Sequence, residues 1–380
     1  MILGIDASNI HSWGGITHLS ELLRAADPGR HGFEQVILWA GEPTHRRLED
    51  RDWLRKQRDP LLERGRLSRF YWQKFRLAAQ ARAARCDVLF VPSGTDAVAY
   101  RPMVTMSQNL LPFDWPELRR FGLSVHSLKY TLLRFAQTRT FRRADDVVFL
   151  TRFAREAVLK VTGPLRGEQP VIPHGMDGKF FHPPRPQRHP DEFTAAAPCR
   201  VLYVSIVDLY KHQWHVVEGI AKLRSQGLEV VLELVGPPKK GTSRLLRTME
   251  ALDPKHEFVR YLGAVPYDRI QEKYLAADIY VLASSCETFG QVLTEAMASG
   301  LPIACSNRSA LPEILGDSGA YFDPEKPVEI AAAVGRLMAS AELRERLAQG
   351  AYEKAQRFSW SRCAEDTFAL LARVGKGRTP

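Results

Sequence analysis

Cysteine is scarce in this sequence of 380 residues, and its five copies are scattered along the chain. Their number is odd and no two stand at a C-x-x-C spacing, so we expect neither a disulfide framework nor a zinc site. We interpret Cys86, Cys199, Cys286, Cys305 and Cys363 as small buried side chains of a protein kept in a reducing cytoplasm.

Long apolar runs are also lacking. No stretch approaches the ~18 uninterrupted apolar residues that a membrane span needs, and the opening residues MILGID predict a buried strand rather than a signal peptide. The sequence contains no H-E-x-x-H, no P-loop, no G-x-S-x-G and no G-x-G-x-x-G. These absences speak against a membrane-spanning protein, a zinc protease, a P-loop nucleotidase and a serine hydrolase.

Charge of one sign, in contrast, is concentrated in two segments. The chain has 53 Lys/Arg and 43 Asp/Glu, a net charge of +10. Residues 44–86 contain thirteen Lys/Arg and five Asp/Glu, and residues 116–143 contain seven and one. The N-terminal half is therefore predicted to have a cationic surface, which attracts nucleic acid, anionic lipid or a phosphorylated substrate.

Aromatic residues accompany the basic stretch 46–85, as Trp53, Phe70, Tyr71, Trp72 and Phe75. Three interpretations remain open. A helix on an anionic leaflet combines rings with Lys and Arg in this way, and so does a nucleic-acid surface. An ordinary helix would turn its rings to the core and its arginines to water. No RNA- or DNA-binding module is present, so nucleic acid is the least favoured of the three.

Short apolar runs alternate with amphipathic stretches in both halves. In the first half we predict strands at 2–5, 35–39, 87–91, 103–106, 147–150 and 170–172, and helices at 16–26, 68–85, 124–144 and 152–160. The second half has predicted strands at 200–204, 229–235, 258–262, 278–283 and 302–305, and helices at 214–225, 243–252, 291–299, 327–339 and 342–356. Apolar strands of this kind are typical of parallel sheets that are covered on both faces.

These elements predict an α/β protein with two Rossmann-like, doubly wound domains that face each other across a cleft. The expected N-terminal domain is 1–183 and the expected C-terminal domain is 199–357. The proline-rich stretch 184–198 is interpreted as an interdomain linker, because closely spaced prolines continue neither a helix nor a central strand. Residues 358–380 form a separate C-terminal helix.

The segment 284–302 has the strongest functional pattern. A buried strand ends, a short loop with Glu287 follows, and a helix begins near Gly290. The start of a helix exposes backbone N–H groups that bind anions, and glycine there allows a ligand close to the backbone. Glu295 follows Glu287 by eight residues, about 12 Å if helical throughout. That separation suits two carboxylates that hold the two hydroxyl-bearing ends of one ligand, with a diphosphate between them.

The E-x7-E spacing in ETFGQVLTEAMASGLP resembles the donor-binding signature of retaining glycosyltransferases of family 4, the group 1 glycosyltransferases, which have the GT-B fold. The resemblance implies that Glu287 contacts the hydroxyls of the donor sugar and that Glu295 binds the ribose. It also implies that the backbone near Thr288, Phe289 and Gly290 holds sugar or phosphate. It assigns residues 1–183 to the acceptor, 199–357 to the nucleotide sugar, and 358–380 to a helix that crosses back to the first domain.

A second segment, VLYVSIVDLYKHQW, combines a strand, a loop and the start of a helix. The resemblance places Ser205 and Lys211 at the donor. A cation 4 Å from the departing diphosphate stabilises its charge by about 4 kcal/mol at an effective dielectric of 20, so Lys211 is a predicted catalytic residue. Glu287, at the donor sugar, is the other. The family usually has an arginine ahead of this lysine, and here Ile206 takes its place. Arg308 or the Lys239–Lys240 loop could supply a second cation.

Two further segments of the first half resemble family positions. Gly14 and Gly15 resemble a loop that approaches the donor phosphate and the acceptor. Gln108 stands where many members have an active-site histidine, which removes a titratable group but keeps hydrogen-bonding capacity. Asn109 and Asp114 are candidate acceptor contacts.

The remaining polar motifs are interpreted as structural. His174, Gly175 and Asp177 resemble the family's segment before the linker, where glycine permits a turn and aspartate caps it. His212 and His215 are interpreted as a surface pair, and Asp50 and Asp52 as solvated surface, so no metal site is predicted.

The expected function is retaining transfer of a hexose such as mannose from a nucleotide diphosphate sugar to a growing glycan or lipid-linked acceptor, in bacterial cell-surface polysaccharide synthesis. We expect no metal or other cofactor, no nucleic-acid partner, and a cytoplasmic location at the inner face of the cytoplasmic membrane, contacted through the basic first domain. The alternatives are a catalytically silent GT-B membrane adaptor, suggested by Ile206 and Gln108, and a basic nucleic-acid-binding protein.

Overall fold

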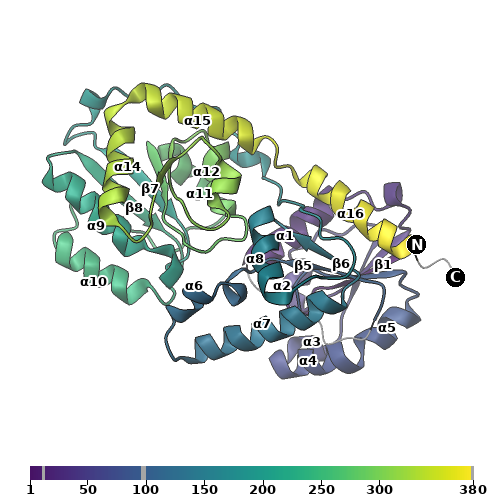
Figure 1. Cartoon of the computed structure of the whole chain (residues 1–380). Helices are drawn as coiled ribbons and strands as arrows, with labels where there is room; N and C mark the ends of the chain where they lie inside the picture. Colours follow the sequence, from purple (N-terminus) through teal and green to yellow (C-terminus); the bar gives the residue numbers. More distant parts are fainter. Residues whose placement is uncertain (11–12, 96–99, 378–380) are drawn as a thin grey trace. The chain divides into compact units, whose positions relative to one another are not determined.

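The computed structural model describes residues 1–10, 13–95 and 100–377, and the chain divides into two compact units (Figure 1). The first unit comprises Met1–Leu118, Leu123–Gly175 and Ser359–Pro380, and the second comprises Arg119–Gly122 and Met176–Phe358. The last three residues of the expected C-terminal segment, 378–380, lie outside the described residues.

The first unit is built on six parallel strands in the order β3-β2-β1-β4-β5-β6. The strands are β1 (Ile2–Asp6), β2 (Gln35–Trp39), β3 (Leu54–Gln57), β4 (Val88–Val91), β5 (Met103–Ser107) and β6 (Asp146–Phe149). The helices are α1 (Trp13–Ala25), α2 (Glu42–His45), α3 (Pro60–Glu63), α4 (Arg66–Phe75), α5 (Leu77–Ala83), α6 (Trp115–Arg119), α7 (Val125–Arg143), α8 (Arg152–Thr162) and α16 (Trp360–Lys376). The inner strands β1, β4 and β5 are almost wholly buried, as strands covered on both faces should be.

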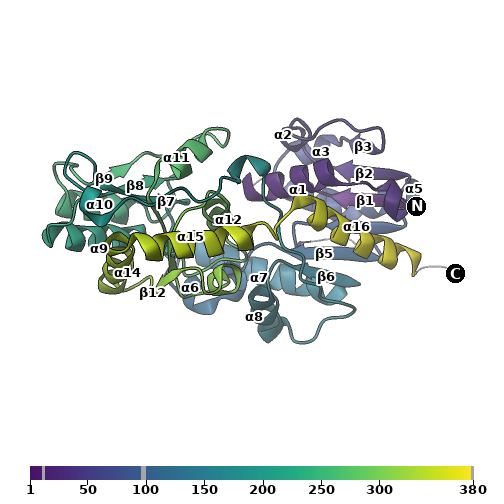
Figure 2. The same cartoon turned by 90° about the horizontal axis from the view of Figure 1, so that it is seen from above.

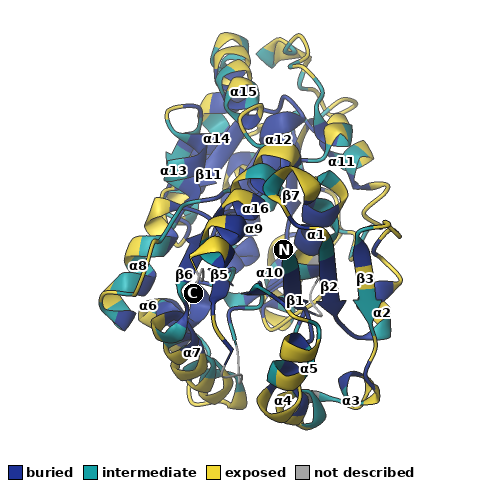
Figure 3. Ribbon diagram, turned by 90° about the vertical axis from the view of Figure 1, so that its right-hand side faces the viewer, coloured by how far each residue is buried: buried dark blue, intermediate teal, exposed yellow. Residues whose placement is uncertain are grey.

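The second unit repeats this architecture with the order β12-β11-β10-β7-β8-β9, again all parallel. Its strands are β7 (Cys199–Val204), β8 (Val230–Val235), β9 (Val259–Tyr261), β10 (Ile279–Leu282), β11 (Ile303–Ser306) and β12 (Ala320–Phe322). Its helices are α9 (Gln213–Ser225), α10 (Thr242–Leu252), α11 (Ile270–Ala276), α12 (Gln291–Ala298), α13 (Leu311–Leu315), α14 (Pro327–Ala339) and α15 (Ala341–Ala355). In Figure 3 most strands are dark blue and the outer helix faces are yellow, so the apolar core lies on the sheets. The predicted pair of Rossmann-like domains is confirmed.

Several predicted boundaries were wrong for identifiable reasons. The helix expected at 68–85 is two helices, α4 and α5, interrupted at Arg76. The strand expected at 170–172 is a single bridge between Phe149 and Val171, because the flanking prolines at 170 and 173 have no N–H to donate. The edge strand β3 escaped prediction because its sequence, LRKQ, is mostly polar.

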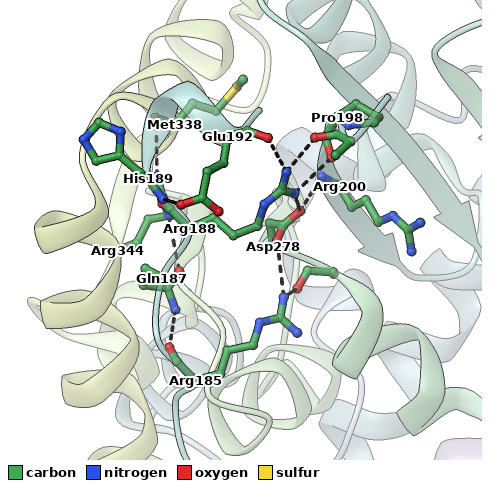
Figure 4. Close-up of polar contacts among 12 residues, drawn as sticks. Arg185, Gln187, Arg188, His189, Glu192, Pro198, Arg200, Asp278, Met338 and Arg344 are labelled. Atoms are coloured by element: carbon green, nitrogen blue, oxygen red, sulfur yellow. Dashed lines mark hydrogen bonds and ion pairs between the residues drawn. The ribbon is translucent and has the colours of Figure 1, made fainter. Parts of the chain in front are cut away.

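The proline-rich stretch 184–198 is not a free linker, because its side chains and backbone are bound to the second unit (Figure 4). The first unit ends at Gly175 rather than at 183. Asp278, just before β10, accepts hydrogen bonds from the backbone N–H of Arg200 at 2.9 Å and from the guanidinium groups of Arg185 and Arg188 at 3.4 Å. Arg188 also donates to the carbonyl of Ala197 at 2.7 Å, which closes the stretch on itself.

Arg344 of α15 holds the same stretch from the other side. Its side chain is fully buried and donates to the carbonyls of Leu337, Met338 and Arg188 and to Oε1 of Gln187. Burial lowers the pKa of this guanidinium. The residue therefore satisfies backbone oxygens that water cannot reach.

We expect Arg344→Leu to lower the free energy of unfolding by about 2–4 kcal/mol, because each buried carbonyl left unpaired costs about 1–3 kcal/mol. Thermal and urea unfolding measure the change. The control is Arg346→Leu, an exposed arginine on the same helix, which should change stability by less than about 0.5 kcal/mol. Equal losses of stability in the two variants would contradict the role of Arg344 in holding the proline-rich stretch.

The segment at His174 and Gly175 packs on the start of α16, a helix that lies beside α1 in the first unit (Figure 2). A Cβ on Gly175 would lie 2.2 Å from the backbone nitrogen of Trp360, so glycine is needed for close packing rather than for the expected turn. The expected cap at Asp177 is confirmed, since its side chain accepts from the N–H of Lys179. The five cysteines are buried and free, as predicted, and Asp50 and Asp52 are exposed.

Candidate functional site

The loop between β10 and α12 forms the centre of the candidate site, at the carboxyl end of a buried strand. Gly290 stands at the N-cap of α12 with φ of 87°, and a Cβ there would lie 2.9 Å from Leu311 Cδ2. Only glycine fits this position without strain. The helix begins at Gln291, as predicted, so residues 287–290 of the spacing between Glu287 and Glu295 are not helical, and the 12 Å expected for a fully helical segment does not apply.

Lys211 and Glu287 are brought together by this fold. Nζ of Lys211 donates to Oε1 of Glu287 in a charged hydrogen bond. The two side chains are only 7 % and 14 % exposed, so Lys211 is not a solvated surface lysine. The segments after β7 and β10 thus place one cation and one anion in contact where little water reaches them.

Backbone contacts hold the two partners in place. Lys211 ends a short 3-10 turn, Leu209–Lys211, which is capped by Asp208, and its carbonyl accepts from the hydroxyl of Tyr203. Ser309, which follows β11, accepts from the N–H of Glu287 and donates to the carbonyl of Glu287, both at 2.8 Å. The position of the ion pair is therefore fixed by the ends of three neighbouring strands.

His212 also belongs to this region, and its interpretation as half of a surface pair was wrong. The side chain is fully buried, and its Nε2 lies 2.9 Å from Oγ of Ser285. Burial lowers the pKa of His212 to about 3, so the ring is neutral at physiological pH. The N–H of Ser285 donates to the carbonyl of Tyr210 at 2.8 Å, which joins the loop after β7 to the loop after β10.

Glu295 is buried inside the unit, at the second turn of α12. Its Oε2 accepts a hydrogen bond of 2.8 Å from the hydroxyl of Tyr274 on α11. Burial raises the pKa of Glu295 to about 7, and the Tyr274 hydroxyl and the charge of Lys179 offset the rise only in part. The carboxyl group is thus divided between neutral and charged forms near physiological pH.

The other predicted donor residues of the second unit are buried near the same strand ends. Ser205 follows β7, and a Cβ on Gly236 would lie 1.9 Å from its carbonyl oxygen, so the β7 and β8 loops approach closely. Thr288 is 9 % exposed. The ring of Phe289 packs edge-on against Phe358 with centroids 5.3 Å apart. Their roles as donor contacts stay predictions.

The candidates for a second cation at the donor differ in their exposure and in their contacts. Arg308 is 53 % exposed and pairs with Asp323 at 2.9 Å. Lys239 and Lys240 are exposed at the start of α10. The carbonyl of Ile206 accepts from the side-chain amide of Gln213 at 2.8 Å. Among the described residues, Lys211 is the cation found in contact with Glu287.

In the first unit, Gly14 and Gly15 lie in the first turn of α1 rather than in the expected loop. A Cβ on Gly14 would meet no neighbouring atom within 4 Å, so the space beside it is open. Asn109 accepts from the N–H of Leu111 and Asp114 from the N–H of Glu117, both at 3.2 Å, as loop and helix-start residues commonly do. Gln108 donates to the carbonyl of Pro92 at 3.1 Å.

Sequence reasoning missed a polar cluster at the carboxyl end of β1. Asp6 is fully buried, and burial raises its pKa. It accepts from the side-chain amide of Gln73 at 2.6 Å and from the N–H of Ser8 at 3.0 Å, while Asn9 donates to Gln73 at 3.1 Å. An acid that ends a buried strand was the signal in the sequence, but its partner on α4 lies 67 residues away.

The described residues contain neither a metal-binding cluster nor a membrane-spanning helix. No group of three or more His, Cys, Asp and Glu side chains could hold a metal ion. No helix in the described ranges is both long and apolar enough to cross a lipid bilayer.

The fold and the site define a class. The model of the family "Glycosyl transferases group 1" matches residues 186–354, and that of "Glycosyltransferase Family 4" matches residues 14–179. The structure resembles sucrose-phosphate synthase from Thermosynechococcus elongatus, with a TM-score of 0.72 and 19 % identity over 99 % of this chain and 100 % of that one. It resembles Anabaena HepE in complex with UDP-glucose equally well, at 0.72 and 17 % over 98 % and 100 %. The fold is that of the GT-B glycosyltransferases.

Curated relatives agree with this class. The chain is 36 % identical over 110 residues to O-antigen chain mannosyltransferase B of Escherichia coli, which is 29 % of either chain. It is 30 % identical over 242 residues, 62 % of this chain and 60 % of the other, to a GDP-mannose-dependent phosphatidylinositol dimannoside mannosyltransferase of Mycobacterium tuberculosis. The match thus spans less than two thirds of either relative. The chain belongs to the group 1, family 4 glycosyltransferases, as the E-x7-E motif indicated.

Proposed function

We propose that the chain is a retaining hexosyltransferase that moves mannose from a nucleotide diphosphate sugar to a growing glycan or a lipid-linked acceptor. The observation that carries the proposal is the buried Lys211–Glu287 pair beside the start of α12. The names of the two mannosyltransferase relatives favour mannose and a role in cell-surface polysaccharide. The protein would act in the cytoplasm, at the inner face of the membrane.

Each charged group has a distinct task in this proposal. The arriving diphosphate replaces Glu287 as the partner of Lys211, and Glu287 becomes available to accept hydrogen bonds from sugar hydroxyls. Glu295 accepts hydrogen bonds from the ribose. The first-turn amides of α12 add donors for sugar or phosphate, and Ser205 and Thr288 border the donor.

The transfer step follows the retaining chemistry of the family. The acceptor oxygen bonds to the anomeric carbon on the face from which the diphosphate leaves, and a leaving phosphate oxygen takes the acceptor proton. Lys211 neutralises the charge that develops on the diphosphate, which is the task of a divalent ion in other enzymes. We therefore propose that no metal or other cofactor is required and that activity persists in EDTA.

A thermal-shift screen of nucleotide sugars tests the proposal. At about 100 times its dissociation constant, a true donor adds about 2.7 kcal/mol of stability. We expect GDP-mannose to shift the midpoint more than UDP-glucose does, and Glu287→Ala to abolish the shift. Lys326→Ala, in an exposed ion pair with Glu329, is the control and should leave the shift unchanged. A screen in which no nucleotide sugar stabilises the wild type would favour a catalytically silent scaffold instead.

A further inference from the structure

The outer face of α7 reverses the usual pattern of a surface helix. Its large apolar side chains face solvent at a spacing of three to four residues, as Val125, Leu128, Leu132 and Phe135. Leu128 is 61 % exposed, Leu132 59 % and Phe135 68 %. This spacing puts the four side chains on one stripe of the helix, so the apolar surface is continuous rather than scattered.

Helix α4 of the same unit has a second stripe of this kind. Leu67, Phe70, Tyr71 and Phe75 are all more than half exposed, and the rings of Tyr71 and Phe75 lie 4.9 Å apart. The opposite side of the helix is fixed inward, because Trp72 is fully buried and donates to Asp59 at 2.9 Å. The aromatics of the basic stretch are therefore divided, with Trp72 in the core and three others facing solvent.

The two helices lie along one edge of the first unit. In Figures 1 and 3, which differ by a turn about the vertical axis, α4 and α7 both form the lower margin of that unit. Figure 3 colours most of their outer surfaces yellow, for exposed residues. A flat partner that meets this edge can contact both stripes.

The charged residues of α4 and α7 themselves have one sign. Lys129, Arg139 and Arg142 are exposed on α7, and Lys74 and Arg76 are exposed at the end of α4. The single acid of residues 116–143, Glu117, is buried, and α4 has no acid at all. A second copy of this surface would bring like charges together, whereas an anionic partner complements them.

We propose that the exposed faces of α4 and α7 dock the protein on an anionic lipid bilayer, with the apolar stripes in the headgroup region and the basic residues on lipid phosphates. Contiguous exposed apolar surface marks an interaction site, and amphipathic helices with Lys or Arg and aromatic residues bind bilayers in this way. Only the purpose of this docking, access to a lipid-linked acceptor, rests on the proposed function. The inner side of α4 presents Gln73 to Asp6 at the carboxyl end of β1, where sheets of this type bind ligands. One helix therefore connects the bilayer with the polar cluster that a lipid-linked acceptor would reach.

Co-sedimentation of the full chain with vesicles tests the inference. We expect binding to phosphatidylcholine vesicles that contain phosphatidylglycerol, much weaker binding to pure phosphatidylcholine, and a decrease as salt rises. The triple variant Leu128→Ser, Leu132→Ser, Phe135→Ser should lose more than tenfold in affinity for the anionic vesicles. Lys129→Glu with Arg139→Glu should lose affinity for them as well, with little change on the neutral ones.

The matched control is Leu246→Ser, an apolar side chain 49 % exposed on α10 of the second unit, which should bind as the wild type does. The thermal shift with a nucleotide sugar is measured on each variant and should be kept, which separates failure of docking from failure of the proposed function. Three results would overturn the inference. They are equal binding to anionic and neutral vesicles, a loss of vesicle affinity in Leu246→Ser as large as in the triple variant, or a wild-type dimer in sedimentation velocity that becomes a monomer in the triple variant. The last would assign the stripes to a second copy of the chain.

Discussion

Replacing Lys211 by alanine is expected to lower the rate of sugar transfer by about a hundred- to a thousandfold, the usual cost of removing one group that stabilises developing charge. Lys211 is the cation in contact with Glu287 in the described part of the chain, and both side chains are largely shielded from water. In the proposed mechanism, its charge would therefore act on the leaving diphosphate with little screening. Release of the nucleoside diphosphate, followed in single turnovers, measures the change.

Stability and catalysis can be separated at this pair. Each single variant, Lys211→Ala or Glu287→Ala, leaves one mostly buried charge without its partner and should also destabilise the fold, whereas the double variant should recover stability and remain inactive. Lys326→Ala is the control, because it breaks an exposed pair. Transfer that recovers together with stability in the double variant would show that the pair is only structural.

Glu295→Gln is expected to make the protein more stable and less able to bind its donor. The folded pKa of about 7 lies above the ordinary value of 4.5, so the native state holds more protons than the unfolded chain between these values. The contribution of Glu295 to stability is complete below about pH 4 and is lost as the pH rises through 7. At 1.36 kcal/mol per unit, ionising it costs up to about 3 kcal/mol, and glutamine avoids this cost.

Unfolding at pH 5 and pH 8 measures the difference in the free energy of unfolding between Glu295→Gln and the wild type. The difference should be small at pH 5 and about 2–3 kcal/mol in favour of the variant at pH 8. Donor affinity at pH 8 should fall by about tenfold, because a neutral amide accepts the ribose hydroxyls less strongly than a carboxylate does. Glu272→Gln, an exposed position on α11, is the control. A variant that gains no stability at pH 8 would contradict a buried Glu295 carboxyl group with a raised pKa.

The turn at Gly290 could be predicted because its signal is local. An apolar strand, a loop and a glycine before a helical pattern lie within twenty residues, and the structure has β10, the loop and α12 in that order. Residue spacing alone could not pair the side chains of the site, and only the family resemblance placed Lys211 and Glu287 at the same ligand. Tyr274 stands 21 residues from Glu295 and Lys211 stands 76 residues from Glu287, and only the fold brings such residues together.

Burial was the second property that the sequence hid. His212 and Glu295 are polar residues, and the sequence analysis did not predict that both side chains are buried. On α4 and α7, several leucines and aromatic residues face solvent, an outcome that the sequence analysis left open for the aromatics of residues 46–85. Hydrophobic periodicity finds an apolar face of a helix but does not say what covers it.

The arginine contacts that hold the proline-rich stretch have a practical consequence for producing the second unit by itself. A fragment cut at 199 would keep Arg344 and Asp278 but would lose Arg185, Gln187 and Arg188, their partners. Such a fragment should be poorly soluble. A usable one should begin near Met176 and end near Phe358, where the chain passes between the two compact units.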